Sequence, residues 1–145
     1  MDYEPTLKIS SRITDSEGDN FMETTVRARL RGTKDDYTIE YSECILPGIT
    51  TNTQITVAGG KSVTVVRSGE IANEITAEQG KRHICHYSLP FGSFEIGIYG
   101  RHVSSEVSEN GGRLDFEYDL CYPDGFITTN AMTLDIYRKG ATANV

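Results

Sequence analysis

The sequence predicts an all-β protein: a single up-and-down antiparallel β-barrel of about 8–10 strands. Three observations support this. Apolar and polar residues alternate with period two along nearly every hydrophobic stretch, those stretches are rich in Thr, Val, Ile and Tyr, and short turns rich in Gly, Asn and Asp separate them. No crossover helix interrupts the series, and a meander of this length usually closes to remove its edges. The alternative, a two-sheet sandwich, needs long Greek-key connections, and the chain offers few loops of that length.

The first half of the chain contains five well-patterned strands. Each has one set of residues that share a face, with polar or charged residues between them. In chain order the sets are Leu7, Ile9 and Ile13; Met22, Thr24, Val26, Ala28 and Leu30; Tyr37, Ile39, Tyr41 and Glu43; Thr53, Ile55 and Val57; and Val63, Val65 and Arg67.

The second half begins with two weaker strands, at 71–76 and 83–89, and then continues the same pattern. The remaining sets are Phe94, Ile96 and Ile98; Leu114, Phe116, Tyr118 and Leu120, which alternate with Arg113, Asp115, Glu117 and Asp119; and Met132, Leu134 and Ile136. The predicted turns are 15–20, 32–35, 59–60, 110–112 and 123–125, where Gly, Asn or Asp tolerate positive φ.

Length and composition bound the function. The 145 residues form one domain, 1–145, with a core from about 7 to 138 and a flexible tail at 139–145. Because the net charge is −7, the protein is not expected to bind nucleic acid. Three widely spaced cysteines predict reduced thiols, and the chain shows no signal peptide and no membrane-spanning stretch. We therefore expect a cytoplasmic protein that does not bind membranes.

Four motifs occur in order between about Lys8 and Tyr137. They are Tyr37-x-Ile39-x-Tyr41-x-Glu43; a Thr/Ile/Val strand ending in Arg67-x-Gly69; Tyr87-x-x-Pro90-Phe91-Gly92; and Gly111-Gly112-x-Leu114-x-x-x-Tyr118-x-Leu120. Together they resemble the YwiB-like family, small bacterial β-barrels of calycin (lipocalin-like) type classed as a domain of unknown function. The chain departs from the family at Leu89, commonly Thr, and at Phe91, more usually Tyr. The resemblance implies a calycin-like barrel and supplies no function.

Two charged side chains are predicted to point into the barrel. Glu43 shares a face with Tyr41, and Arg67 shares a face with Val65. Because an isolated buried charge is very unfavourable, the two either pair with each other or line a polar, water-filled cavity. In the second case Arg67 would hold a ligand carboxylate or phosphate. The predicted ligand-binding set is Arg67, Glu43, Tyr41, Tyr118, Tyr37 and Tyr87.

Other candidate sites have simpler explanations. Lys8, Arg12, Arg27, Arg29 and Arg31 form a basic outer face on the first two strands, which closure would place beside acidic residues such as Asp135. His83 and Cys85 face one way and His86 the other, so no metal site is predicted. The 59–62 segment resembles the end of a phosphate-binding loop, but a strand follows it where a helix is required. No cofactor is expected.

Three functions remain open. The leading hypothesis is non-catalytic binding of a small anionic or amphipathic ligand at a barrel end. The second is a protein–protein interaction module, with self-association possible, built on a closed and filled barrel. The third is an enzyme in which Glu43 acts as a general base, for which no second catalytic group is identifiable.

Overall fold

The computed structural model describes residues 1–46, 48–69, 72–89 and 92–138, with backbone only at 44–46, 49 and 87–89. The tail predicted at 139–145 lies outside these residues. Within them there is no helix, and so none that is long and apolar enough to cross a membrane. The described chain is entirely strands and turns, as predicted.

The described residues form eleven strands, and from β2 to β10 each strand pairs antiparallel with the one that follows it. Their bounds are β1 Asp2–Tyr3, β2 Thr6–Asp15, β3 Gly18–Gly32, β4 Tyr37–Leu46, β5 Ile49–Ala58, β6 Ser62–Ser68, β7 Ala72–Glu78, β8 Arg82–Leu89, β9 Gly92–Ser108, β10 Gly111–Cys121 and β11 Ile127–Tyr137. Pairing of β11 with β2 and of β3 with β4 completes the ring. The predicted up-and-down barrel is confirmed.

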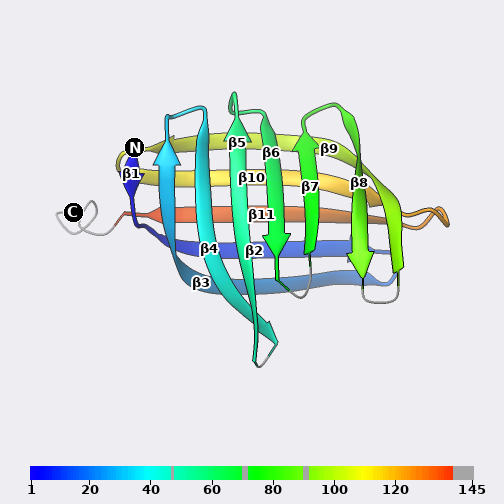
Figure 1. Cartoon of the computed structure of the whole chain (residues 1–145). Helices are drawn as coiled ribbons and strands as arrows, with labels where there is room; N and C mark the ends of the chain where they lie inside the picture. The colour runs from blue at the N-terminus through cyan, green and yellow to red at the C-terminus, as the bar shows by residue number, and fades with distance from the viewer. Residues whose placement is uncertain (47, 70–71, 90–91, 139–145) are drawn as a thin grey trace.

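The barrel has two layers whose strands cross at a steep angle (Figure 1). β2, β3, β9, β10 and β11 run along one layer, and β4 to β8 form the other. β3 belongs to both: its first ten residues pair with β2, and then it bends so that 28–32 pairs with β4. Strands that bend from one sheet into the other make the corners of such orthogonal packings.

β9 makes the second corner. Its first half pairs with β8, and its pairing with β10 shifts register by one residue opposite Glu117 and Tyr118. Gly100 lies at this shift, where the β7–β8 turn crosses it so closely that a Cβ would lie 2.1 Å from the Glu78 carbonyl oxygen. Glycine is therefore required at this corner.

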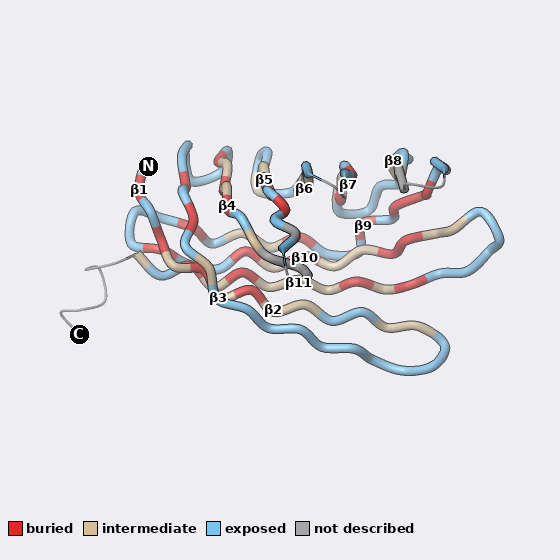
Figure 2. The backbone as a smooth tube through the Cα atoms, turned by 60° about the horizontal axis from the view of Figure 1, so that its bottom comes forward, coloured by how far each residue is buried: buried red, intermediate tan, exposed pale blue. Residues whose placement is uncertain are grey.

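The core lies between the layers, where the predicted inward faces meet (Figure 2). Its largest fully buried side chains include Leu7, Leu30, Tyr37, Ile39, Ile55, Phe116 and Leu134. A smaller cluster of Ile75, Cys85, Ile96, Ile98 and Leu120 lies apart from this main core. The alternation read from the sequence is confirmed for these strands.

The turns differ from prediction at two hairpins and, by one residue, at 32–35, where Gly32 still belongs to β3. The first hairpin turn is only Ser16 and Glu17, because β3 already starts at Gly18. Similarly, Gly111 begins β10 and the turn before it is Glu109 and Asn110. In both hairpins, glycine and polar residues that suit a turn instead belong to a strand, because they pair with the neighbouring strand.

One side of the barrel is open. β3 pairs with β4 only from Ala28 onward, so the β4-facing edge of 18–27 has no partner among the described residues. The exposed end of the β2–β3 hairpin is visible in Figure 2. Among the described residues, β7 and β8 are also paired only at Ala72 and Asn73. We call the region between the edge of β3 and the adjacent ends of β4 to β7 the open side, and the opposite, filled region the closed side.

Candidate functional site

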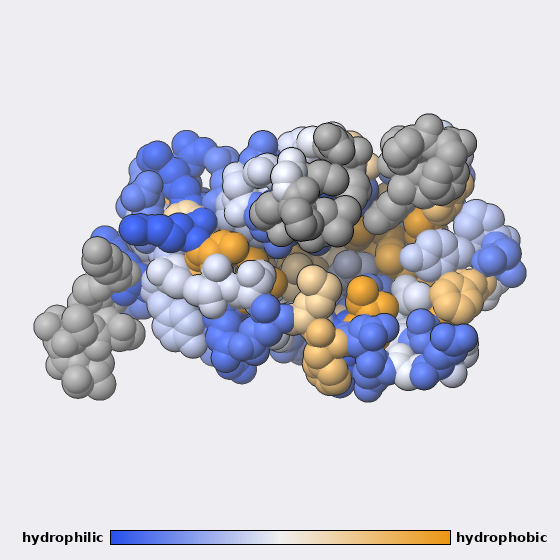
Figure 3. Space-filling view, turned by 90° about the horizontal axis from the view of Figure 1, so that it is seen from below, coloured by the Kyte–Doolittle hydropathy of each residue, from blue (hydrophilic) through white to orange (hydrophobic). Residues whose placement is uncertain are grey.

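Two adjoining cavities, with volumes of about 250 and 310 Å³, lie at the open side. Four residues line both: Ser11, Ile13, Arg67 and Met132. The first cavity continues toward β10 and β11, and the second opens between β3 and the ends of β4 and β7. Viewed from the β3 side, apolar side chains are exposed in a hollow between the layers (Figure 3).

A row of four polar side chains crosses β4 to β7 at the second cavity, and three of them, Tyr41, Arg67 and Asn73, line it. Tyr41, Thr53, Arg67 and Asn73 are successive partners in the register of β4, β5, β6 and β7. Partners directly opposite in a sheet point to the same face, and in this sheet that face is the interior. The ladder itself therefore places four polar groups side by side where each strand approaches the open side.

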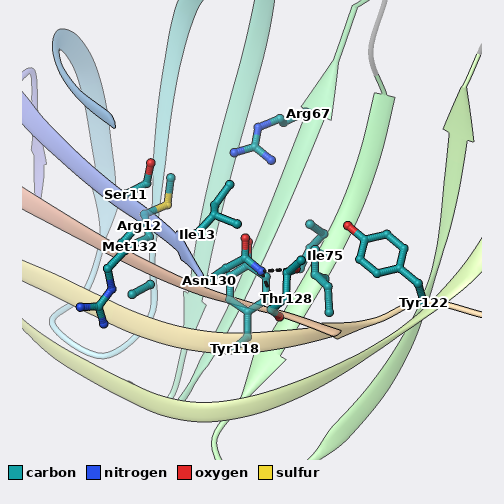
Figure 4. A pocket seen from close by; sticks show the side chains of 12 residues that line it. Ser11, Arg12, Ile13, Arg67, Ile75, Tyr118, Tyr122, Thr128, Asn130 and Met132 are labelled. Carbon is teal, nitrogen blue, oxygen red and sulfur yellow. Dashed lines mark hydrogen bonds between the residues drawn. The ribbon is translucent and has the colours of Figure 1, made fainter. Parts of the chain in front are cut away.

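Arg67 is the central group of this row. It is partly buried, and its guanidinium points into the first cavity above Ile13 and Asn130 (Figure 4). It forms no ion pair with any described residue. Glu43 lines the second cavity beside it, and the two residues form no ion pair. Of the two arrangements that the sequence allows, the structure contains the polar cavity and not the ion pair.

Tyr41 lies in the wall between these charges. The pKa of its phenol is raised to about 12, mainly by burial and also by the Glu43 charge, while the Arg67 charge lowers it. The facing Thr53 hydroxyl is near enough to lower this pKa slightly, but the Tyr41 and Thr53 hydroxyls have no partner of normal hydrogen-bond geometry in the described part of the chain. The buried hydroxyl of Thr51, which lies opposite Glu43, also has no hydrogen-bond partner among the described residues. These groups are available to a polar ligand or to water.

The opposite wall is mixed. Tyr118 lines the first cavity and stacks on Phe116, with ring centroids 6.0 Å apart. Asn130 is buried, and its side-chain nitrogen donates to the Thr128 hydroxyl at 3.1 Å (Figure 4). Apolar surface comes from Ile13, Ile75, Leu120 and Met132. The first cavity thus combines the inward Arg67 guanidinium, several hydroxyl and amide groups, and an apolar surface; Arg12 also lines it, but its guanidinium lies away from Arg67 (Figure 4).

Not every predicted residue reaches this site. Arg67, Glu43, Tyr41 and Tyr118 do. Tyr37 instead lies in the core of the closed side, where its hydroxyl and that of Ser105 are 2.6 Å apart and burial raises its pKa to about 12. The backbone of Tyr87 pairs with Asn73, but its side chain, like that of Leu89 and the whole of Phe91, lies outside the described residues.

The sequence does not identify the further lining residues Ser11, Ile13, Asn73, Asn130 and Met132 as site residues, nor Thr51, which lies opposite Glu43. The alternation that assigns inward faces contains a signal for several of them. Along β5, for example, the inward residues change from Val57 and Ile55 to Thr53 and Thr51. A change from apolar to hydroxyl-bearing residues on one face indicates where that face leaves the dry core.

The other candidates lie elsewhere. On the basic face, Arg29 pairs with Asp2 and Arg31 with Glu40. Lys8 lies opposite Asp135, as predicted, but contacts Glu23 at 3.7 Å, since Asp135 is bonded to Arg113.

The predicted parity around Cys85 is confirmed. Cys85 is buried and His86 is exposed, while the His83 ring nitrogen lies 3.0 Å from the Glu78 carboxylate. Burial raises the pKa of the Cys85 thiol.

Comparison with known proteins adds the family. The crystal structure of the ywiB protein from Bacillus subtilis superposes with a TM-score of 0.77 at 23% identity, covering 93% of this chain and 92% of that one. A likeness at this identity establishes the fold alone. No curated protein sequence matches the chain. A family model described as a domain of unknown function, DUF1934, matches residues 7–134. The chain therefore belongs to the DUF1934 family, which confirms the resemblance stated from its motifs.

Proposed function

We propose that the protein binds a small anionic or amphipathic molecule in the open-side cavities, without catalysing a reaction on it. Arg67 would hold the anionic group. The single observation that supports this most strongly is a partly buried guanidinium that points into a cavity and has no ion-pair partner among the described residues. Withdrawing a charge from water is unfavourable unless it is compensated, and a carboxylate or phosphate compensates a guanidinium with two parallel hydrogen bonds.

The surroundings of Arg67 fit the rest of such a ligand. The hydroxyls of Tyr41 and Thr53 can accept or donate hydrogen bonds near the anionic group. Ile13 and Met132, which line both cavities, offer apolar surface to a hydrocarbon portion. Each cavity is near the lower limit of ligand pockets, roughly 300–1,000 Å³, so a ligand of modest size is expected.

The absence of catalysis is supported by the composition of the lining. Glu43 is the only carboxylate among the described residues that line the two cavities, and no His or Cys accompanies it there. General acid–base chemistry needs a proton donor and acceptor at the reacting atoms. In our proposal Glu43 instead accepts a hydrogen bond from a ligand hydroxyl or amine and restricts the anionic group to the Arg67 side.

The experiment is a thermal-shift titration with three probes that share one chain length: octyl phosphate, octanoate and uncharged octanol. Native mass spectrometry of protein purified from its own host tests for a copurifying ligand in parallel. Arg67→Ala is compared with Arg12→Ala, because Arg12 lines the first cavity but its guanidinium lies away from Arg67 (Figure 4).

We expect the charged probes to raise the melting temperature of the wild type and of Arg12→Ala, because a ligand that binds only the folded state stabilises it. Arg67→Ala should lose this response, and octanol should shift the melting temperature little in any variant. Equal shifts with all three probes, or an unchanged response in Arg67→Ala, would show that Arg67 does not hold an anionic group.

A further inference from the structure

The β4-facing edge of β3 is a long unpaired strand edge. Residues 18–27 pair with β2 on one side only, and β4 joins the other side from Ala28. Phe21 and Met22, at the middle of this segment, are 73% and 69% exposed. The segment contains no proline, and its register with β2 shows no bulge, so it lacks two common devices that prevent edge-to-edge pairing.

The direction of the backbone groups follows from the pairing on the other edge. Ala28 N donates to the Pro5 carbonyl and Gly32 N to the Met1 carbonyl, so even-numbered residues of β3 direct their N–H and C=O groups toward β1 and β2. Groups alternate between the two edges along a strand. The free edge is therefore formed by the odd-numbered residues Asp19, Phe21, Glu23, Thr25 and Arg27, whose side chains lie on the outer face.

This edge is complementary to itself. In an antiparallel pair of two β3 strands, the register that centres on Glu23 uses all five of these residues, and it places Asp19 opposite Arg27 twice. Asp19 accepts a hydrogen bond from Thr14 through one carboxylate oxygen only, and Arg27 has no ion pair with a described residue. A register centred one residue before Glu23 leaves Arg27 without an opposite residue on the second edge. A register centred one residue after Glu23 places Phe21 opposite Arg27.

The other pairs in this register are compatible. Phe21 lies opposite Thr25, a large aromatic side chain against a β-branched one, which is a favourable cross-strand pair. Glu23 lies opposite its own copy, but Lys8 contacts Glu23 at 3.7 Å in each protomer and offsets the repulsion. The unpaired backbone groups and the exposed Phe21 and Met22 would be covered together.

We propose that the protein forms a two-fold symmetric dimer in which the β3 edges of two copies pair antiparallel about Glu23. The layers containing β2 and β3 then form one continuous sheet across the two barrels. The paired edge borders the second cavity, which Met22 and Thr24 of β3 line. Arg67 lies on β6 and is not part of the paired edge, so Arg67→Ala remains a dimer whatever the outcome of the ligand experiment.

The test is sedimentation velocity over a range of concentrations, with charge reversals at the predicted ion pair. In Asp19→Arg the introduced guanidinium faces Arg27 of the second copy, and in Arg27→Asp the introduced carboxylate faces Asp19. The dimer dissociation constant of each variant is expected to be at least about tenfold higher than that of the wild type, because two attractive pairs become repulsive. Glu74→Arg, an exposed reversal on the outer face of β7, is the control and stays dimeric.

Mixing the two reversal variants is the decisive arm. A heterodimer of Asp19→Arg with Arg27→Asp restores an attractive pair at both positions, so the dimer returns although each variant alone is monomeric. This rescue also shows that both variants fold. A monomeric wild type, which would leave the edge to another strand-donating partner, overturns the proposal; so does a dimer insensitive to the reversals, or a mixture that stays monomeric.

Discussion

Two tyrosines on β4, four residues apart, show how the closed and open sides of the barrel differ. Tyr37 and Tyr41 face the same interior, are almost fully buried, and have pKa values raised to about 12 mainly by burial. The Tyr37 hydroxyl is hydrogen-bonded to Ser105 across the barrel, whereas the Tyr41 hydroxyl has no such partner among the described residues. On the closed side the tyrosine hydroxyl is thus part of the hydrogen-bonded core, and on the open side it is available to a ligand or to water.

The neighbouring strands repeat this change. Inward residues of β5 and β6 are Val and Ile on the closed side, and Thr53 and Arg67 on the open side. One half of each strand therefore contributes the apolar burial that stabilises the barrel. The other half contributes the Thr53 hydroxyl and the Arg67 guanidinium, which have no hydrogen-bond or ion-pair partner, respectively, among the residues that the structure describes. The difference indicates that the open side is kept polar for something other than stability.

The largest expected effect is at the closed side. Ile55→Ala removes a fully buried side chain from the main core and is expected to lower the free energy of unfolding by about 2–5 kcal/mol, through lost transfer energy and the cavity left behind. Chemical denaturation measures it. A loss below about 1 kcal/mol would mean that the closed side is not the stabilising half.

A second prediction concerns Asp119. Like Arg67 it is a charged residue that is withdrawn from water, but unlike Arg67 it has partners of opposite charge or polarity among the described residues. Burial alone would raise the Asp119 pKa, but hydrogen bonds from Arg101, at 2.8 Å, and from Thr129 outweigh it and hold the pKa below its usual value. A carboxyl with a depressed folded pKa stabilises the fold above its unfolded pKa, roughly 3.9, and this contribution is lost as the pH falls through the folded value.

Asp119→Asn is therefore expected to be less stable than the wild type at pH 7, with the gap narrowing below about pH 4. Urea denaturation of both proteins at a series of pH values measures the gap. A gap that stays constant down to pH 2 would show that the ionised form of Asp119 is not what the partners stabilise.

The smallest expected effects come from the two tyrosines themselves. Tyr37→Phe leaves the Ser105 hydroxyl without this partner and is expected to cost about 0.5–1.5 kcal/mol. Tyr41→Phe removes a hydroxyl that has no hydrogen-bond partner in the described part of the chain, so the free energy of unfolding should stay the same or rise slightly. Equal losses in the two variants, measured side by side by denaturation, would contradict the distinction between the two sides.

The sequence predicts the fold well because alternation is a local property. Period-two patterns assign the inward faces of strands such as β4 and β6, and this is enough to identify Glu43 and Arg67 as inward charges. What it cannot supply is where a strand loses its neighbour. The parting of β3 from β4 after Ala28 depends on the bend of β3 between layers, which no local pattern encodes. For this reason the pattern assigns Tyr37 and Tyr41 to one site, although of the two only Tyr41 lines the second cavity.

The most direct test of the open side as a binding site is NMR of the arginine side chains during titration with octyl phosphate. The Arg67 Nε–H signal is expected to shift strongly and saturably, because its guanidinium would bind the phosphate. The Arg12 signal is expected to stay in place, because its guanidinium lies away from Arg67 (Figure 4). Shifts at Arg12 and the outer arginines with none at Arg67 would contradict the account, since the anion would then bind the basic surface and not the cavity.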